Sequence, residues 1–421
     1  MTERQQIPSR ESIASAAADA LERAHADGTL AETPALAGFD GFLDSIIRVV
    51  DRRGSMALED FAPISTISDF AGRIAAAAGK STNIELVVDE IRFGGNGPLY
   101  AGALGRLGMP TTYVGAVGRD DGSSELLPIF EAFAARCERV IPIAAPAYTD
   151  ALEFADGKIM FGRPVNMQAV TWERLVERVG LEELRAMCAR ARLLGIVDWT
   201  HCGGLQGIWE GLIEHVLPGL EGVGGEVSSR AGKPAPLDVK RRVFIDLSDP
   251  AKRTDADLRS ALEVLRRMNR FVSVTLGLNL AEGERVAAVL GVEAFADAAS
   301  QGEGVRAAAA RVRARAGLSC VVIHPREGAG AADDSGQSAW FEGPFTAQPR
   351  LSTGAGDHFG AGFSFAQVLG LPLGQALAVG CAVSGAYVRD AVSPDLSRLT
   401  SFLRGLPGAD EAADAPGTSG G

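Results

Sequence analysis

The sequence predicts an α/β fold of three layers, with a mainly parallel sheet between two layers of helices and a small β-rich lid. One observation is a series of continuous apolar runs, typical of parallel strands buried on both faces, at residues 193–199, 243–247, 271–276 and 319–323. Helical patterns separate these runs, at residues 171–190, 206–217, 255–269, 281–290 and 305–316.

The remaining segments predict how this domain is bounded. An amphipathic pattern at residues 11–29 indicates a helix ahead of the domain, and residues 221–242, rich in Gly, Ser and Pro, indicate an inserted loop. We expect a helical extension at 1–34, one domain at 35–404 and a flexible tail at 405–421. The lid is expected from the segments near 42–50, 86–93 and 148–163, the last of which forms a hairpin.

Composition excludes several classes of protein. The 421 residues carry a net charge of −12, which argues against nucleic-acid binding. No apolar run is long enough to cross a bilayer, and the start MTERQQIPSR lacks the apolar core of a signal peptide. The five cysteines are scattered, as expected of reduced thiols in a cytoplasmic protein.

Three apparent motifs carry little weight. The string Gly79-Lys80-Ser81 ends like a phosphate-binding P-loop, but isoleucine stands where that motif needs its first glycine. The histidines lack the spacing of metal ligands, and a loop contact is the preferred interpretation of His201. The loosely spaced glycines of residues 354–360 leave a nicotinamide-dependent oxidoreductase as a weak alternative.

The strongest chemical signal is the string R-L-S-T-G-A-G-D-H-F-G-A-G-F at residues 350–363. Its glycines and small polar residues precede an apolar helical run, so free backbone N–H groups at the helix start can bind an anion. An aspartate at this point would repel the same anion. A division of roles resolves the conflict: the N–H groups hold the anion, while Asp357 faces a hydroxyl and removes its proton. A capped helix with an aspartate in its first turn is the structural alternative.

This string resembles the C-terminal signature D-T-x-G-A-G-D of the ribokinase-like, or PfkB-type, carbohydrate kinases. Residues 94–108, G-G-N-G-P-L-Y-A-G-A-L-G-R-L-G, are similar to the family's diglycine signature. Residues 115–122, G-A-V-G-R-D-D-G, resemble its G-x-V-G-x-D-x-x-G motif, and residues 279–282, N-L-A-E, match N-x-x-E. The motifs occur in the family's order and cover about residues 35–390.

The resemblance implies a ribokinase-like fold and a role for each matching residue. Asp357 matches the catalytic base, and the anion hole matches Gly354, Ala355 and Gly356. Contacts to the sugar whose hydroxyl accepts the phosphate are implied for Asp44, or alternatively Asp40, and for Gly94, Gly95 and Asn96. Nucleotide contacts are implied for Asn279, Ser352 and Thr353, and Glu282 is implied to hold Mg²⁺ through water.

The implied reaction transfers the γ-phosphate of ATP, with Mg²⁺, to a hydroxyl of a sugar or sugar-like small molecule. The resemblance also allows a monovalent cation and a homodimer formed through the lid. Leu351 and Leu99 depart from the family's aspartate and asparagine. A nucleoside kinase of the same superfamily and a catalytically silent sugar-binding regulator therefore remain as alternatives.

Overall fold

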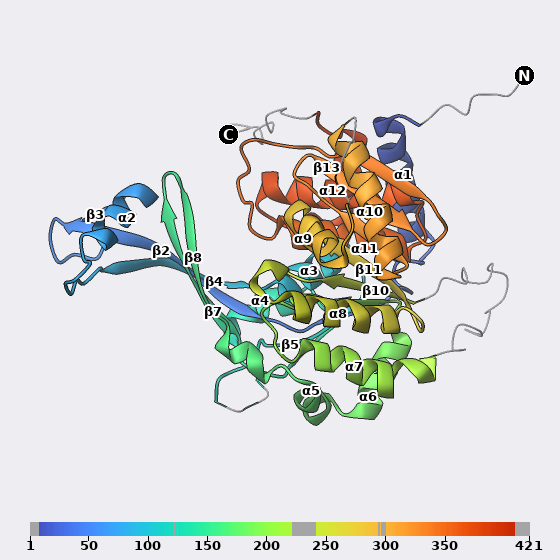
Figure 1. Cartoon of the computed structure of the whole chain (residues 1–421), viewed down its shortest axis with the longest axis horizontal. Coiled ribbons are helices and arrows are strands. Elements are labelled where there is room, and N and C mark those ends of the chain that lie inside the picture. Colours follow the sequence, from blue (N-terminus) through green and yellow to red (C-terminus); the bar gives the residue numbers. More distant parts are fainter. Residues whose placement is uncertain are drawn as a thin grey trace, which may run out of the picture.

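The computed structural model of the chain describes residues 8–121, 123, 125–220, 241–293, 295 and 300–408. A large sheet lies between helices, and a smaller sheet extends away from it (Figure 1). The order of strands in the large sheet is β14 (Ser338–Glu342), β13 (Gly328–Asp333), β12 (Cys320–Ile323), β11 (Ser273–Leu278), β10 (Arg242–Asp246), β9 (Leu193–Ile196), β1 (Ala35–Gly38), β5 (Thr111–Gly115) and β6 (Arg139–Pro142). Neighbours from β12 to β6 are parallel, which confirms the predicted mainly parallel sheet, and β13 and β14 add antiparallel pairs.

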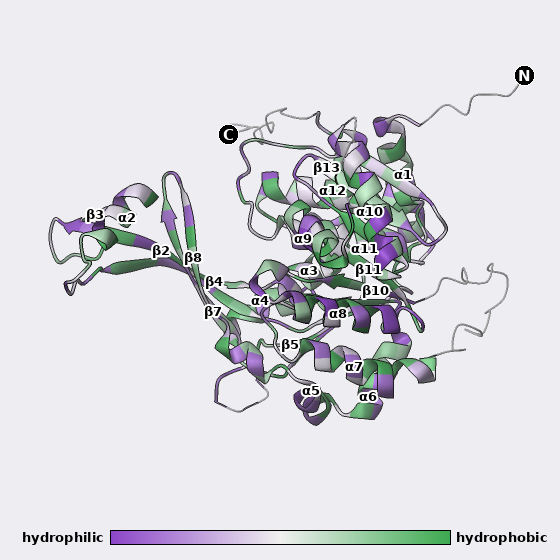
Figure 2. Ribbon diagram, in the orientation of Figure 1, coloured by the Kyte–Doolittle hydropathy of each residue, from purple (hydrophilic) through white to green (hydrophobic). Residues whose placement is uncertain are grey.

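Helices cover both faces of this sheet. On one face lie α5 (Trp172–Val179), α6 (Leu181–Arg190), α7 (Leu205–His215), α8 (Asp255–Met268), α9 (Leu280–Leu290) and α10 (Gln301–Ala316). On the other lie α1 (Arg10–Ala26), α3 (Asn96–Arg106), α4 (Glu131–Ala134), α11 (Ala355–Val368), α12 (Leu373–Asp390) and α13 (Leu396–Arg404). Figure 2 shows purple and green residues along α8, as expected of a helix with one buried side.

The central strands divide their side chains between the two layers. On β1, Leu36 packs into the cluster beneath α5–α10, whereas Ala35 and Ala37 join the cluster beneath α3 and α11. Successive side chains of a strand point to opposite faces, and both faces here are dry. The runs are therefore apolar throughout rather than alternating.

One helical prediction needs a correction. The pattern at residues 171–190 is not one helix but two, because Gly180 adopts a φ of 82° between α5 and α6. That left-handed conformation suits glycine and ends α5. Residues 221–240 and 409–421, which include most of the predicted loop and tail, lie outside the described residues.

The smaller sheet contains all three segments expected in the lid. Its strands are β2 (Phe42–Arg53), β3 (Phe61–Pro63), β4 (Leu86–Gly94), β7 (Ala147–Phe154) and β8 (Gly157–Arg163). Strand β2 pairs with β7 on one edge, and with β4 and then β3 on the other. Helix α2 (Ile67–Ala75) packs Phe70 against Ile47, Val49 and Leu152, so the smaller sheet has its own apolar cluster.

The described part of the chain contains neither a membrane-crossing helix nor a disulfide. None of its helices has the length and apolarity required to cross a membrane. All five cysteines are free thiols, and four of them are buried.

The large sheet and α3 approach closely at Gly195 on β9. A Cβ atom there would collide with the ring of Tyr100, which is fully buried, stacks on Phe244 at 5.5 Å and bonds to Ser364 Oγ at 2.7 Å. Glycine is therefore required by packing at this position.

We expect Gly195→Ala to lower the free energy of unfolding by about 1–3 kcal/mol, the usual cost of overpacking a core. Urea denaturation measures this change. Gly207→Ala on α7 is the matched control, because nothing lies within 4 Å of its added Cβ, and alanine favours a helix by up to about 1 kcal/mol over glycine. Equal stability of the two variants would contradict the packing account.

Candidate active site

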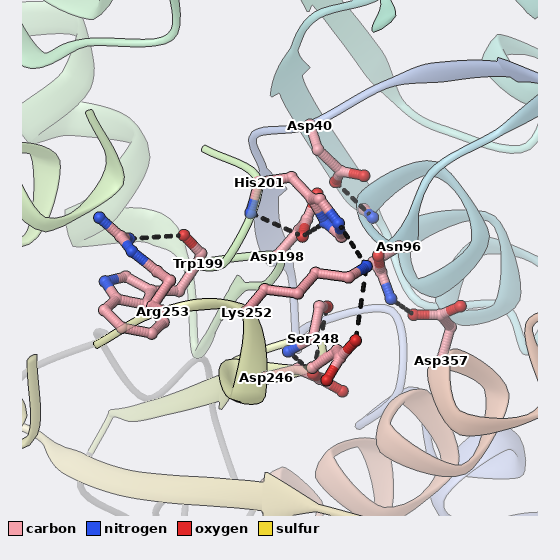
Figure 3. Close-up of polar contacts among 12 residues, drawn as sticks. Asp40, Asn96, Asp198, Trp199, His201, Asp246, Ser248, Lys252, Arg253 and Asp357 are labelled. Carbon is pink, nitrogen blue, oxygen red and sulfur yellow. Dashed lines mark hydrogen bonds and ion pairs between the residues drawn. The ribbon is translucent and has the colours of Figure 1, made fainter. Parts of the chain in front are cut away.

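Four aspartates converge beside the carboxyl ends of neighbouring parallel strands (Figure 3). Asp40 follows β1, Asp198 follows β9, and Asp246 ends β10, while Asp357 lies in the first turn of α11. All four side chains are buried. In open α/β sheets this edge is where ligands bind, so the cluster marks the candidate site.

The diglycine string holds Asp40 in place. The N–H of Gly97 donates to Asp40 Oδ1 at 2.6 Å, and the hydroxyl of Tyr113 donates to the Asp40 carbonyl. A Cβ atom on Gly95 or Gly97 would lie 2.7 or 2.5 Å from the Asp40 carboxylate, which is closer than side chains tolerate. The glycines thus let the start of α3 approach a buried carboxylate.

Asn96 connects the same string to Asp357. Its Nδ2 donates to Asp357 Oδ1 at 2.8 Å, across 261 residues of sequence. The structure therefore brings together the N-terminal and C-terminal strings that the sequence singled out. Helix α3 supplies the amide donor, and α11 supplies the carboxylate.

The loop before α11, where the sequence predicts an anion hole, contains a glycine with positive φ. Gly354 has a φ of 87°, and no side chain caps the helix. Tyr387 donates to the Thr353 carbonyl at 2.8 Å and so fastens the loop to α12. The Ala355 N–H donates to the Ser352 carbonyl at 3.2 Å, so this amide already has an acceptor within the loop.

Leu99, the departure from the family's asparagine, packs against this loop. A Cβ added to Gly354 would lie 2.9 Å from Leu99 Cδ1. At this position an apolar side chain supports the loop before α11 by packing instead of by hydrogen bonding.

The two candidates for the early aspartate occupy different sheets. Asp40 lies at the edge of the large sheet, whereas Asp44 lies within β2 of the smaller sheet, opposite Arg92 of β4. The Asp44 carboxylate rests against Gly94. Burial raises the pKa of Asp44, and a hydrogen bond from Thr149 opposes that rise. Both carboxylates lie against the glycine string, Asp44 at Gly94 and Asp40 at Gly95 and Gly97.

Asn279 and Glu282 form a capping box at the start of α9. Asn279 Oδ1 accepts from the Glu282 N–H, and Glu282 Oε2 accepts from the Asn279 N–H, both at 2.9 Å. Glu282 Oε1 also accepts from the Asp249 N–H at 2.9 Å. The N-x-x-E motif therefore orders the loop after β10 as well as its own helix.

The motifs did not identify Asp198, His201, Asp246 or Lys252. Asp198 has a φ of 63°, and its Oδ1 lies 2.6 Å from His201 Nδ1. Lys252 ends the short helix Pro250–Lys252, and its Nζ lies 3.3 Å from His201 Nε2. Their position in the sequence was the available signal, since Asp198 and Asp246 each stand near the end of a continuous apolar run. The loop-contact interpretation of His201 missed this network.

Mutual repulsion and burial perturb these carboxylates. Burial, and then the Asp246 charge, raise the pKa of Asp357, while burial and Asp198 raise the pKa of Asp40. Burial and Glu282 raise the pKa of Asp246. Buried carboxylates with raised pKa values are suited to proton transfer or to binding hydroxyl donors.

The residues fit a magnesium ion that keeps most of its water. No group of three or more His, Cys, Asp or Glu in the described ranges could hold a metal alone. Mg²⁺ usually binds one or two carboxylates together with substrate phosphates and water. Asp246 at the end of β10 and Glu282 in the first turn of α9 match that requirement.

Comparison with solved structures identifies the fold. Arabidopsis thaliana ribokinase, complexed with ribose and ATP, matches with a TM-score of 0.56 and 15% identity, over 89% of this chain and 99% of that one. A mutant of phosphofructokinase-2 from Escherichia coli matches with a TM-score of 0.55 and 14% identity, over 88% and 99%. The fold is that of the ribokinase-like kinases, as the sequence motifs implied.

Sequence comparison then gives the family. The family model for prokaryotic ketohexokinase matches residues 13–406, so the chain belongs to the prokaryotic ketohexokinase family. Ketohexokinase of Haloferax volcanii is 29% identical over 374 residues, which cover 88% of this chain and 90% of the relative. The chain is thus a carbohydrate kinase, which transfers a phosphoryl group to an alcohol, and the oxidoreductase alternative is wrong.

The raised carboxylate pKa values predict how stability depends on pH. A folded state that binds protons more tightly than the unfolded state is most stable at low pH and loses stability as pH rises above about 4. Between pH 5 and 7 we expect the free energy of unfolding of Asp246→Asn to fall less steeply than that of the parent, by up to about 1.4 kcal/mol per pH unit. Urea midpoints of the ligand-free protein measure it.

Asp255→Asn serves as the control for this measurement. Asp255 is exposed, and its hydrogen bond with Arg285 lowers its pKa, so its titration lies below pH 5. Parallel stability curves for the parent and Asp246→Asn would contradict the electrostatic account.

Proposed function

We propose that this kinase transfers the γ-phosphoryl group of ATP to a hydroxyl of a ketohexose, with Asp357 as the general base. The observation that carries the proposal is the buried Asp357 carboxylate at the N-terminus of α11, hydrogen-bonded to Asn96. The names of the family and of the Haloferax relative support the ketohexose. The Arabidopsis ribokinase complex supports ATP as the donor.

In the proposed step, Asp357 removes the proton of the acceptor hydroxyl. The hydroxyl oxygen forms a bond to the γ-phosphorus, the bond from that phosphorus to the bridging oxygen breaks, and ADP leaves with the electron pair. Asn96 holds Oδ1, so we assign Oδ2 of Asp357 to the acceptor. A raised pKa makes the ionised carboxylate a stronger base.

The donor's phosphates are assigned to the start of α11. Backbone N–H groups and the helix dipole favour negative charge there, and the loop of Ser352, Thr353 and Gly354 borders the same point. Bound Mg²⁺ would neutralise part of the phosphate charge. Asp246 and the Asn279–Glu282 box would hold it through water.

The acceptor is assigned to the carboxylates on the other side of Asp357. Asp40 Oδ2 and Asp198 Oδ2 are buried and have no hydrogen-bond partner among the described residues. Leaving them unpaired is costly, and hydroxyl donors of a sugar would satisfy both oxygens. Asp44 and the backbone of Gly94 and Gly95 complete the site from the lid. A site lined by carboxylates favours a neutral polyol over a sugar acid or sugar phosphate.

The lid supports two further parts of the proposal. Closing over the acceptor would exclude water, which otherwise competes for the phosphoryl group. The lid also exposes apolar side chains, among them Leu86, Val88, Ile91, Met160 and Phe161. We propose that a second copy of the chain covers them in a homodimer. The free cysteines support a cytoplasmic location.

An acceptor panel tests the proposed function. With Mg²⁺ and ATP present, kcat/KM measured from ADP release should be at least about tenfold higher for a neutral ketohexose than for a ketohexose phosphate or a nucleoside. Efficient turnover of the nucleoside would favour the nucleoside-kinase alternative. Sugar binding without turnover, seen by calorimetry, would favour the silent regulator.

A further inference from the structure

Lys252 carries a positive charge to the edge of the carboxylate cluster. Its Nζ lies 3.3 Å from His201 Nε2 and 3.4 Å from Asp249 Oδ2. His201 in turn lies against Asp198, with 2.6 Å between His201 Nδ1 and Asp198 Oδ1. Figure 3 shows the resulting series from a buried carboxylate through an imidazole to an ammonium group.

The partners of His201 determine which of its nitrogens carries hydrogen. Asp198 Oδ1 can only accept when ionised, so His201 Nδ1 donates to it. Nε2 is then the acceptor, and it faces the ammonium group, which has only donors. His201 therefore orients Lys252 rather than repelling it.

Lys252 keeps donor capacity after these contacts. An ammonium group has three donors, and His201 and Asp249 engage two of them. The side chain is 58% exposed, so the remaining donor is accessible to a ligand. Asp198 and Asp249 both have left-handed backbones, with φ of 63° and 60°. Such strain in non-glycine residues concentrates at functional sites.

The chemistry of the site gives this cation a task. Acidic side chains line the site, and the ATP that must enter it is negative. One other cation near the site is already engaged: Arg253 lies over the Trp199 ring at 4.1 Å and donates to the Trp199 carbonyl. A neutral ketohexose offers Lys252 no anion, so the anion must be phosphate.

The position of Lys252 indicates that it contacts the phosphoryl group being transferred. Asp249 accepts from Lys252 and donates its N–H to Glu282, on the donor's side of the site. His201 and Asp198 lie on the acceptor's side. The ammonium group is held between the two.

We propose that Lys252 is a catalytic residue that contacts the transferring phosphoryl group, and that His201 and Asp198 position it. The inference rests on the proposed function. Lys252 forms no covalent bond. Its charge stabilises the negative charge on the phosphoryl oxygens. This stabilisation is strongest when the ammonium group is already in place before the reaction.

Lys252→Met tests the role in catalysis. We expect kcat to fall on the order of 10- to 100-fold, with the ketohexose KM within about twofold of the parent's because the variant keeps the acceptor's carboxylates. Lys252→Arg, which keeps the charge, should recover most of kcat. Added methylammonium should partly restore Lys252→Ala, whose missing side chain leaves room for it. Lys80→Met, at an exposed lysine beyond α2, is the matched control.

His201→Asn tests the positioning role. Asparagine can still donate to Asp198 from Nδ2, but it offers nothing at the position of Nε2. We expect kcat to fall about fivefold, and the double variant with Lys252→Met to lose no more than Lys252→Met alone, because His201 acts through Lys252. Melting temperatures near the parent's would show that the variants fold.

The outcomes separate this inference from the proposed function. A parent that phosphorylates no ketohexose would remove both. An active parent whose Lys252→Met variant keeps more than half of its kcat would overturn this inference alone. Losses that multiply in the double variant would overturn the positioning role of His201.

Discussion

The feature on which the site depends is the confinement of several like charges in a buried space. Asp40, Asp198 and Asp246 reach one region because parallel strands end together at one edge of the sheet, and the start of α11 brings Asp357 to the same region. Water would separate these carboxylates, whereas the fold holds them with N–H donors from Gly97, Asn96 and Ser248. Burial and mutual repulsion accordingly raise the pKa values of Asp40, Asp246 and Asp357.

This confinement explains why glycine occurs where it does. Side chains on Gly94, Gly95 or Gly97 would collide with the carboxylates of Asp44 or Asp40. The glycine string is thus a means of bringing the start of α3 against acidic groups of both sheets. Through Asn96 the same helix reaches Asp357, so one short segment connects both sheets to the proposed base.

The sequence allowed the sheet, the lid segments and the two glycine strings to be identified, because each leaves a local pattern. Continuous apolar runs reflect burial on both faces, and the order of motifs reflects the family. Asp198 and Asp246 escaped because an aspartate after a strand is common, and only the order of β1, β9 and β10 makes these two neighbours. The contact of His201 with Lys252 joins segments 51 residues apart and has no counterpart in local spacing.

The central claim is that Asp357 acts as a base and not merely as part of a helix start. Asp357→Asn keeps the size of the side chain and can keep a hydrogen bond with Asn96, but it loses the basic oxygen. The decisive measurement is kcat with ATP and a ketohexose, taken beside ATP affinity and melting temperature. We predict a loss on the order of 10² to 10⁴ in kcat, which corresponds to roughly 3 to 5 kcal/mol of barrier, with ATP binding retained. Turnover above about a tenth of the parent's, in a folded variant that binds ATP, would contradict the role of Asp357 as base, because loss of a general base costs at least about a hundredfold.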